Sequence, residues 1–475
     1  MAGSEPVGTA AELAAHAHHA PSFAVTLVFT AVLVGMVLTL ALEERLHAKK
    51  SVITGIYAVL SLGLGHATGI LPFGPVVNVF GEELSLPVYI QGIDWGVIAI
   101  ILGSSLFVDV TSRSGLFTFI AIKLTKASGG DPFRLLVAYG LMTVVFSALL
   151  NNVTAMIIVG SLTAVSLEKL DARDKLLGFL LIEGLLTNVG GLLTLISSVP
   201  NIIVGAAAGI SFVTFFEVAA GYVVVATTLT LLLGAKRYGV ASLREEAAKA
   251  KARERVMSFD ERDGIESQGF FVVAAVMLVA FIVSIAASSV TGYPLGMGFV
   301  AMAFGLVMLL RFKGTADRFY RTLDWDLLLF FAFLFIVINV MEHAAVLTLI
   351  GEGLGAIIAL NDAAEGAGTA ATLVSAAGFS AVTDNIPLAA MLARILEGMV
   401  PLSDDRLWWS VIFGANLGGN LTPIGSASTV VAVTLMHKHG LAMSFGAFVR
   451  AAAAFALMQI ALAVLYVLFA VPLVG

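Results

Sequence analysis

Cysteine is absent from the 475 residues, and charged side chains are scarce. Without cysteine the chain forms no disulfide, holds no Cys-ligated metal and has no thiol nucleophile. Asp, Glu, Lys and Arg make up only 12% of the residues, about half the share that is usual in soluble proteins. The net charge of −6 gives no reason to expect a nucleic-acid partner.

Apolar stretches replace the missing charge. Hydrophobic residues make up 59% of the chain, and apolar runs near ~20 residues, enough to cross a ~30 Å hydrocarbon core, recur along it. The sequence therefore predicts an all-α polytopic membrane protein embedded in the lipid bilayer of the cell inner or plasma membrane. Residues 1–22 have no basic start and no clear cleavage site, so we expect a short polar tail rather than a signal peptide.

One unit of sequence occurs twice. SALLNNV, which begins at Ser147, returns as SAVTDNI at Ser380, an offset of 233 residues (380 minus 147). LLTNVGGLLTLISSVPN returns as FGANLGGNLTPIGSAS, in which Asn416 matches Asn188 at an offset of 228 (416 minus 188). Matches in the same order at nearly one offset indicate an internal duplication.

The apolar pattern predicts ten full spans and two shorter hairpins. The expected spans are Phe23–Leu42, Val52–Leu71, Ile93–Val110, Leu176–Val204, Phe212–Gly234, Phe270–Ser289, Pro294–Leu310, Leu327–Met341, Leu407–Met436 and Ala451–Val471. Leu135–Leu167 and Gly366–Leu396 are long for one crossing and short for two. Each is expected to be a re-entrant hairpin, with Asn151-Asn152 at the tip of the first. Leu116–Ala127 and Val346–Leu360 are expected to be interfacial helices that link a span to a hairpin.

Basic residues decide the predicted orientation. With this topology, all but Arg394 and Arg406 of the 26 Lys and Arg fall on one face, which is then cytoplasmic. Both termini are expected outside. Each repeat has five spans plus one re-entrant hairpin, so the second repeat has inverted topology, as in many secondary transporters. All four Trp residues are expected at the membrane interface: Trp95, Trp325, Trp408 and Trp409.

The expected organisation has four parts. A polar N-terminal tail covers 1–22, the first membrane repeat 23–235, a solvated cytoplasmic linker 236–268, and the second, inverted membrane repeat 269–475. A helix is expected in the linker around Leu243–Met257.

Two of the expected spans are predicted to be broken helices. Leu176–Val204 and Leu407–Met436 are longer than one crossing requires. Each contains a Gly-Gly pair that weakens a helix and a proline that removes a backbone donor. Half-helix ends would then face whatever binds between the hairpin tip and the break.

Polar residues gather at these places. In the first repeat the candidates are Asn151, Asn152, Thr154, Glu183, Asn188, Gly190, Gly191, Thr194, Ser197, Ser198 and Asn201. In the second they are Thr383, Asp384, Asn385, Asn416, Gly418, Gly419, Thr422, Ser426 and Ser428, beside Asn420 and Thr429. Hydroxyl and amide oxygens suit a hard cation or an oxygen-rich anion. The alternative is that these residues only cap helices and satisfy the backbone.

Two carboxylates lie within membrane segments, where charge is costly. Asp384, at the second hairpin tip, is a cation ligand, a proton carrier or a helix cap. Glu183 lies nearer the cytoplasmic end of its span, where it binds an ion, pairs with Lys175 or faces water.

The chain resembles a known family in these motifs. FSALLNNVTAMI with EGLLTNVGG, SAVTDNIPLAAM with GANLGGNLTPIGSAS, and HGLAMSFGAFVR are similar to the ion transporter superfamily. The branch is that of arsenite efflux pumps and the melanosomal P-protein, with NhaD-type sodium/proton antiporters nearby. The resemblance implies a homodimer with elevator-type movement and hairpin-tip ligands, including Na⁺ at Asn152 and at Asp384 with Asn385. Asn151 and Ser197-Ser198 stand where many relatives carry a carboxylate, which leaves Asp384 as the main ionisable group.

The sequence thus predicts a secondary active transporter rather than an enzyme. The expected activity is antiport of a small ion or oxyanion, such as Na⁺ or arsenite, against H⁺, with no cofactor beyond the coupling ion Na⁺ or H⁺. A sodium-coupled dicarboxylate or citrate symporter is the alternative. A passive channel does not need duplicated broken helices, and no HExxH motif or zinc-ligand cluster indicates an intramembrane enzyme.

Overall fold

The computed structural model describes residues 21–77, 80–262, 264–291, 295–383, 385–399 and 405–474. Within these residues the regular secondary structure is helical except for one short antiparallel ladder, in which Val76 pairs with Leu84 and Val77 with Glu83. The all-α membrane fold is therefore as the sequence predicts. The chain divides into two compact units, which are described separately.

The first unit comprises residues 1–94 and 329–352. Its elements are α2 (Phe23–Ala41), α3 (Glu43–Leu46), α4 (Lys50–Thr68), β1 (Val76–Val77), β2 (Glu83–Leu84), α5 (Val88–Gln91), most of α17 (Trp325–His343) and the start of α18 (Val346–Ile358). α2 packs against α4. Gly55 of α4 lies directly against the Phe333 ring of α17, where a Cβ atom would come within 3.0 Å of that ring.

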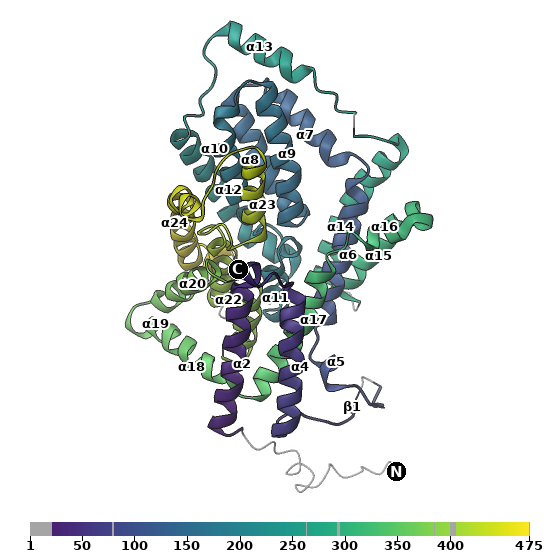
Figure 1. Ribbon diagram of the computed structural model, residues 1–475, viewed down its shortest axis with the longest axis vertical. Helices are drawn as coiled ribbons and strands as arrows, with labels where there is room; N and C mark the ends of the chain where they lie inside the picture. The colour runs from purple at the N-terminus through teal and green to yellow at the C-terminus, as the bar shows by residue number, and fades with distance from the viewer. Residues whose placement is uncertain are drawn as a thin grey trace. The chain divides into compact units, whose positions relative to one another are not determined.

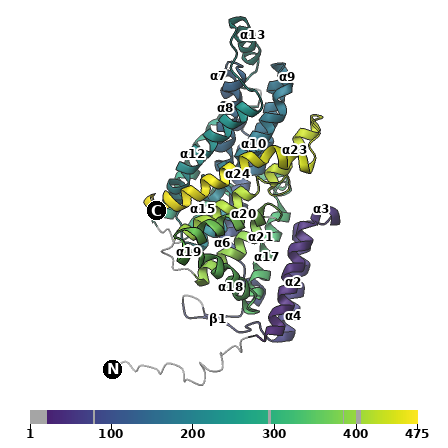
Figure 2. The same cartoon turned by 90° about the vertical axis from the view of Figure 1, so that its left-hand side faces the viewer.

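The second unit comprises residues 95–328 and 353–475 and contains both hairpins and both broken helices. Its first elements are α6 (Trp95–Ser112), α7 (Leu116–Ala127), α8 (Pro132–Leu149), α9 (Asn152–Lys169), η1 (Arg173–Lys175), α10 (Leu176–Gly190), η2 (Leu195–Ser197), α11 (Val199–Ala207), α12 (Phe212–Arg237), α13 (Glu246–Met257), α14 (Gln268–Thr291), α15 (Gly296–Leu309), η3 (Leu310–Thr315) and α16 (Ala316–Tyr320). The later elements are α19 (Leu360–Ala363), α20 (Ala367–Ser380), α21 (Asn385–Met399), α22 (Asp405–Gly418), α23 (Ala427–Lys438), α24 (Phe445–Phe469) and α25 (Val471–Val474). α8, α9 and α10 pack side by side (Figure 1). Figure 2 shows α24, in yellow, as one long helix.

Ten helical segments of the described chain are long and apolar enough to cross a membrane. α8 and the run Val346–Ala363 belong to this set, although neither is among the ten spans expected from the sequence. The predicted spans Leu176–Val204 and Leu407–Met436 do not belong to it, because each is divided into two shorter helices. The number of candidate spans is as predicted, but the membership differs at these four segments.

The order of elements repeats along the chain. In each half, two long helices precede a span, a connecting helix, a helical hairpin, a broken helix and a final long helix. The first half runs from α2 to α12, and the second from α14 to α24. The repetition follows the duplication in the sequence. The inverted orientation of the second repeat stays a prediction.

Both predicted hairpins are helix–turn–helix units. α8 and α9 hold 18 residues each, which corresponds to about 27 Å per arm. α20 and α21 hold 14 and 15 residues, about 22 Å, which is short of a ~30 Å hydrocarbon core. The first turn falls at Leu150 and Asn151, at the predicted tip.

The breaks fall at the predicted glycine pairs. α10 ends at Gly190 and α22 ends at Gly418. α11 and α23 then begin at Val199 and Ala427, with Pro200 in the first turn of α11. The prediction of two broken helices is confirmed.

Two of the four Trp predictions are wrong. Trp95 and Trp325 are 55% and 50% exposed, which fits an interfacial position. Trp408 and Trp409 are each only 1% exposed, and the Trp409 ring lies 5.0 Å from that of Phe215. These two indoles belong to the core because they lie within α22, which is covered by α20, α21 and α24.

The helix expected in the linker is present as α13, and most linker side chains are exposed, but a few of them pack on α7. Glu261 pairs with Lys126 and, at 3.2 Å, with Lys123, both on α7. Val256 and Phe259 of the linker are buried against Ile122 of α7. α13 therefore lies anchored over the ends of α7 and α9 (Figure 1).

Candidate functional site

The tip of the first hairpin carries two adjacent asparagines with different contacts. Asn151 is exposed and caps α9, its Oδ1 accepting a hydrogen bond of 2.7 Å from the backbone N–H of Thr154. Asn152 faces the broken helix. Its Oδ1 accepts from Ser147 Oγ at 2.6 Å, and its Nδ2 donates to Asn188 Oδ1 at 3.3 Å. Asn152, and not Asn151, is thus the tip residue that bonds to a candidate residue of the broken helix, Asn188.

Side chains hold the break between α10 and α11 in place. Ser197 Oγ donates to the carbonyl of Gly191 at 2.5 Å. Asn201 Nδ2 donates to the carbonyls of Gly191 and Thr194 at 2.7 and 3.0 Å. Unpaired carbonyls are costly at membrane depth, so these two side chains stabilise the break.

A serine hydroxyl on each hairpin lies equally close to a carbonyl of the neighbouring broken helix. Ser147 Oγ lies 2.6 Å from the carbonyl oxygen of Thr187. Ser380 Oγ donates to the carbonyl of Ala415 at the same distance. The residues of the two bonds are equivalent in the duplication, so the first arm of each hairpin joins its own broken helix in the same way.

A threonine in each break repeats this correspondence. Thr194 Oγ1 donates to the carbonyl of Ala148 at 2.6 Å, and Thr422 Oγ1 donates to that of Ala381 at 2.6 Å. Both hydroxyls connect a break with the end of a hairpin arm. The duplication is therefore visible in individual hydrogen bonds.

Other bonds cross from one repeat to the other. Asn188 Nδ2, in the first repeat, donates to Ser426 Oγ at 2.9 Å and to Asn420 Oδ1 at 2.8 Å. Its Oδ1 accepts from Ser428 Oγ at 3.2 Å. Ser426 also caps α23, in a reciprocal pair with Thr429. The amide of the first repeat therefore lies against the break of the second.

Asn416, the equivalent of Asn188, makes the reciprocal contacts. Its Oδ1 accepts from Ser198 Oγ at 2.7 Å, and its Nδ2 donates to Asn201 Oδ1 at 2.8 Å. Ser198 is the equivalent of Ser426. The contact between Asn188 of the first repeat and Ser426 of the second therefore has a counterpart between Asn416 of the second repeat and Ser198 of the first. Neither break is complete without residues of the other repeat.

The glycine pairs provide space for close packing. A Cβ atom at Gly190 would lie 2.7 Å from Val144 Cα, and one at Gly418 only 2.2 Å from the carbonyl oxygen of Ala377. Gly191 and Gly419 face Asn152 Oδ1 and Ser426 Cβ in the same way, at 2.7 and 2.9 Å. None of the four has a positive φ. Gly190 and Gly418 are required because the hairpin arm and the broken helix touch backbone to backbone there.

The second hairpin tip is described in part. Thr383 is half-buried, and its hydroxyl donates to the Phe379 carbonyl at 2.8 Å. Asn385 begins α21. Asp384 lies outside the described residues, so its role as a Na⁺ ligand stays a prediction. Arg394, on α21, pairs with Glu397 at 3.1 Å.

Glu183 lies deeper than expected. It is 0% exposed, and its Oε1 accepts a hydrogen bond of 2.6 Å from Thr163 Oγ1 of α9. Its Oε2 has no hydrogen-bond partner among the described residues. Of the alternatives for Glu183, pairing with Lys175 is not observed, and Lys175 instead pairs with Asp174 at 3.0 Å.

One contributor is absent from the candidates found in the sequence. Gln459 of α24 is 0% exposed and accepts a hydrogen bond of 2.8 Å from Asn420 Nδ2. Between Arg450 and Tyr466 it is the only residue with a polar side chain, and an isolated amide in such a run was the available signal.

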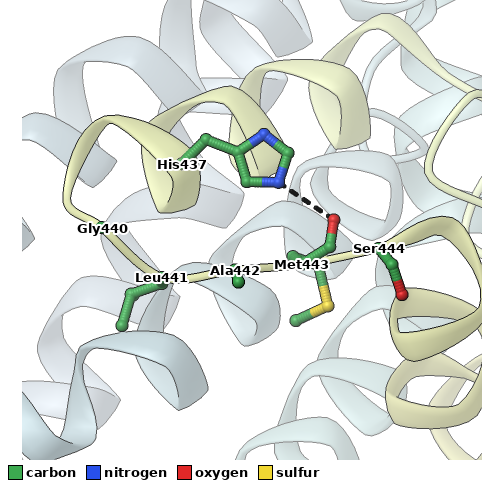
Figure 3. A pocket seen from close by; sticks show the side chains of 6 residues that line it. All are labelled: His437, Gly440, Leu441, Ala442, Met443 and Ser444. Carbon is green, nitrogen blue, oxygen red and sulfur yellow. Dashed lines mark hydrogen bonds between the residues drawn. The ribbon is translucent and has the colours of Figure 1, made fainter.

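A surface hollow of about 500 Å³ lies at the far end of α23 from the break. It is lined by the loop from Gly440 to Ser444 and by His437, whose Nε2 lies 3.0 Å from the Met443 carbonyl (Figure 3). None of the candidate residues lines it, so it is separate from the site.

Comparisons with known proteins agree with a transporter. The family model CitMHS, described as "Citrate transporter", matches residues 25–414. A Mycobacterium bovis protein named as an uncharacterized transporter is 30% identical over 387 residues, which covers 79% of this chain and 86% of the relative. The P protein of Mus musculus is 25% identical, across 92% of this chain and 61% of that protein.

Among solved structures, the YdaH transporter of Alcanivorax borkumensis has the same fold. It aligns with a TM-score of 0.55 at 11% identity, over 90% of this chain and 99% of that chain. The expected resemblance to the ion transporter superfamily is therefore confirmed. With the greater part of its length matched by the family model, the chain belongs to the CitMHS citrate transporter family, whose members are membrane transporters and not enzymes.

Proposed function

We propose that this transporter is a secondary active antiporter that exchanges a small ion or oxyanion for protons, with Glu183 as the proton carrier. The cargo binds between the first hairpin tip and the paired breaks. The hairpins and broken helices move together past the remaining helices, in an elevator-type cycle. Na⁺ and arsenite are the cargoes to test first.

The burial of Glu183 carries this proposal. A carboxylate removed from water is costly unless it is paired and fully hydrogen-bonded. Glu183 has one hydroxyl donor on one oxygen and none among the described residues on the other. A protonated carboxyl fits such surroundings, and an ionised one requires access to water or a cation. Loading and release of a proton can therefore be linked to a change of conformation.

The residues near the hairpin tip support a cation or a neutral oxyacid as cargo. The cross-repeat contacts of Asn188 and Asn416 involve amides and hydroxyls only. A free dianion usually requires Arg, Lys or several unoccupied N–H groups. Arg394 already pairs with Glu397. A bound Na⁺ at Asn152, or at Asp384 with Asn385, would change the local charge.

Sodium-coupled uptake of citrate or a dicarboxylate is the second candidate. The description of the matching family as "Citrate transporter" favours it. In that case Na⁺ would bind first and supply the positive charge that the carboxylate groups need.

The arrangement in the membrane is part of the proposal. We propose a homodimer in the cell inner or plasma membrane, with linker 236–268 in the cytoplasm and both termini outside. The distribution of Lys and Arg supports this orientation.

Flux measurements test the function. Purified protein in liposomes that contain a pH-sensitive dye is given a gradient of Na⁺ or of arsenite, and we expect coupled proton movement. Glu183→Gln should abolish that movement. Glu217→Gln, which changes an exposed carboxyl on α12, should retain it.

Three outcomes would contradict the proposal. Proton movement that is unchanged in Glu183→Gln removes Glu183 from the mechanism. Na⁺-driven citrate uptake without proton movement favours the symporter. If the cargo never accumulates against its own electrochemical gradient, the protein is a passive channel.

A further inference from the structure

Gln459 is a buried amide on an otherwise apolar helix. Its side chain is 0% exposed, and all of its polar groups are bonded. Oε1 accepts from Asn420 Nδ2 at 2.8 Å, and Nε2 donates to Thr230 Oγ1 of α12 at 3.0 Å. Its backbone carbonyl accepts from the Tyr222 hydroxyl at 3.0 Å. A polar group is kept in such a place only when every partner is present.

Gln459 lies at one end of a chain of amides that reaches the first hairpin tip. Asn152 donates to Asn188, Asn188 to Asn420, Asn420 to Gln459, and Gln459 to Thr230. At every amide the NH₂ group donates to the next residue, and the carbonyl oxygen accepts from the previous one. The chain therefore has one direction over its whole length.

That direction determines which atom of Asn188 faces the hairpin tip. Asn420 Oδ1 can only accept, because Asn420 Nδ2 is held by Gln459 Oε1 and by the Leu185 carbonyl at 3.1 Å. Asn188 must therefore present its NH₂ group to Asn420 and its carbonyl oxygen to the tip. A reversed Asn188 would place two oxygens against each other.

The tip-facing oxygen is held less tightly than the NH₂ group. Asn188 Oδ1 accepts from Asn152 and Ser428 at 3.3 and 3.2 Å, longer than usual for such bonds. Its Nδ2 makes bonds of 2.8 and 2.9 Å to Asn420 and Ser426. A ligand can replace the two long bonds, and an amide carbonyl oxygen is a good ligand for a hard cation.

We propose that Gln459 is a positioning residue of the transport site: through Asn420 it fixes Asn188 with the carbonyl oxygen toward the first hairpin tip, where that oxygen binds a cation. The proposal rests on the proposed function in one respect only, that the hairpin tip is the ligand site.

In the first repeat Leu192 follows the glycine pair, where the second repeat has Asn420. The amide chain is thus a feature of one repeat.

Cation-dependent thermal unfolding of the full-length protein in detergent tests the proposal. Na⁺ is the probe, replaced by choline at constant ionic strength. The midpoint of the wild-type protein should rise with Na⁺. Gln459→Met removes the acceptor for Asn420. The Na⁺ concentration that gives half of the maximal rise in the unfolding midpoint should therefore increase roughly five- to tenfold, as expected for the loss of one net hydrogen bond. Gln459→Glu keeps a carbonyl oxygen toward Asn420 and should stay within about twofold of the wild type.

Tyr466→Phe is the matched control. It removes another bond between α24 and α12, a partly buried one from the Tyr466 hydroxyl to the Val218 carbonyl at 2.7 Å, without touching the amide chain. It should lower the midpoint in choline and leave the half-saturating Na⁺ concentration unchanged. If Gln459→Met does not fold, Thr230→Val removes the far end of the chain and should change the Na⁺ response in the same direction.

Two results would overturn the proposal. One is an unchanged Na⁺ response in Gln459→Met, or an equal change in Tyr466→Phe. The other is a wild-type midpoint that does not respond to Na⁺, which contradicts the cation-facing orientation of Asn188. The latter result leaves proton flux through Glu183 untouched, so the two proposals fail separately.

Discussion

Asn416 Nδ2 donates a hydrogen bond of 2.8 Å to Asn201 Oδ1. The bond joins the first half-helix of the second repeat to the second half-helix of the first. Both side chains are buried, at 1% and 0% exposure, so neither finds water if its partner is removed.

We expect Asn416→Ala to lower the free energy of unfolding by about 2 kcal/mol, because Asn201 and Ser198 each lose a buried partner. A double-mutant cycle with Asn201→Ala should give a coupling energy of about 1 kcal/mol. Denaturant titration in mixed micelles measures both. Asn361→Ala, which removes a cap from Gly368 at the start of α20, is the control and should combine additively with Asn416→Ala. Additive behaviour of Asn416→Ala and Asn201→Ala would contradict the cross-repeat contact.

Gly418→Ala should destabilise the second hairpin. The new methyl group would lie 2.2 Å from the Ala377 carbonyl oxygen, which forces α20 and α22 apart and costs about 1 to 3 kcal/mol. Gly378 lies on α20, the hairpin arm that Gly418 contacts. The new methyl group of Gly378→Ala meets no atom within 4 Å, so this change should be neutral or slightly stabilising. Thermal unfolding compares the two. Equal effects would mean that the two helices do not touch at Gly418.

The attachment of the linker should resist acid. Hydrogen bonding to Lys126, with Lys123 and the backbone adding to it, lowers the pKa of Glu261 from 4.5 to about 2. Because the folded pKa lies below the unfolded one, the attachment is complete above about pH 4.5 and is lost as the pH falls toward 2. A fluorophore on Lys251→Cys should therefore report a restrained α13 at pH 6 and a mobile one near the folded pKa.

Two variants check this assignment. Glu261→Gln, in the turn after α13, should make α13 mobile at pH 7, whereas Glu254→Gln, at an exposed position on α13 itself, should not. Release of the wild-type linker already at pH 6 would show that Glu261 is not the group that holds it.

The orientation of the repeats is testable because the chain lacks cysteine. Single cysteines at Lys251, in the linker, and at Glu365, before the second hairpin, should react with an impermeant maleimide from opposite sides of the membrane. Pre-blocking with a permeant thiol reagent is the control. Labelling of both positions from outside would contradict inverted topology.

The sequence predicted the parts of the fold that depend on local signals. Gly190-Gly191 and Gly418-Gly419 mark the breaks, and the charge-free run around Asn151 marks a hairpin, because these signals act over a few residues. Trp408 was misplaced because an indole suits both a membrane interface and a packed core. Only the neighbouring helices decide between them.

Hydrogen-bond partners that lie on distant segments could not be predicted from the sequence. Asn188 and Asn420 are 232 residues apart, and nothing in either motif specifies the other. Glu183 was correctly singled out as a buried carboxyl, but its donor Thr163 lies on a different helix. Gln459 was missed because its role depends on Asn420 and Thr230, which belong to two other segments.

The reciprocal breaks also matter for the order in which the protein is made. The ribosome completes Asn188 and its Gly-Gly break long before it reaches Asn420 and Ser426. Until then, the first repeat contains an amide and an interrupted backbone whose partners do not exist, and hydrocarbon cannot substitute for them. Insertion of the first repeat and maturation of its binding site are therefore separate events in biogenesis, divided by the synthesis of nearly half the chain.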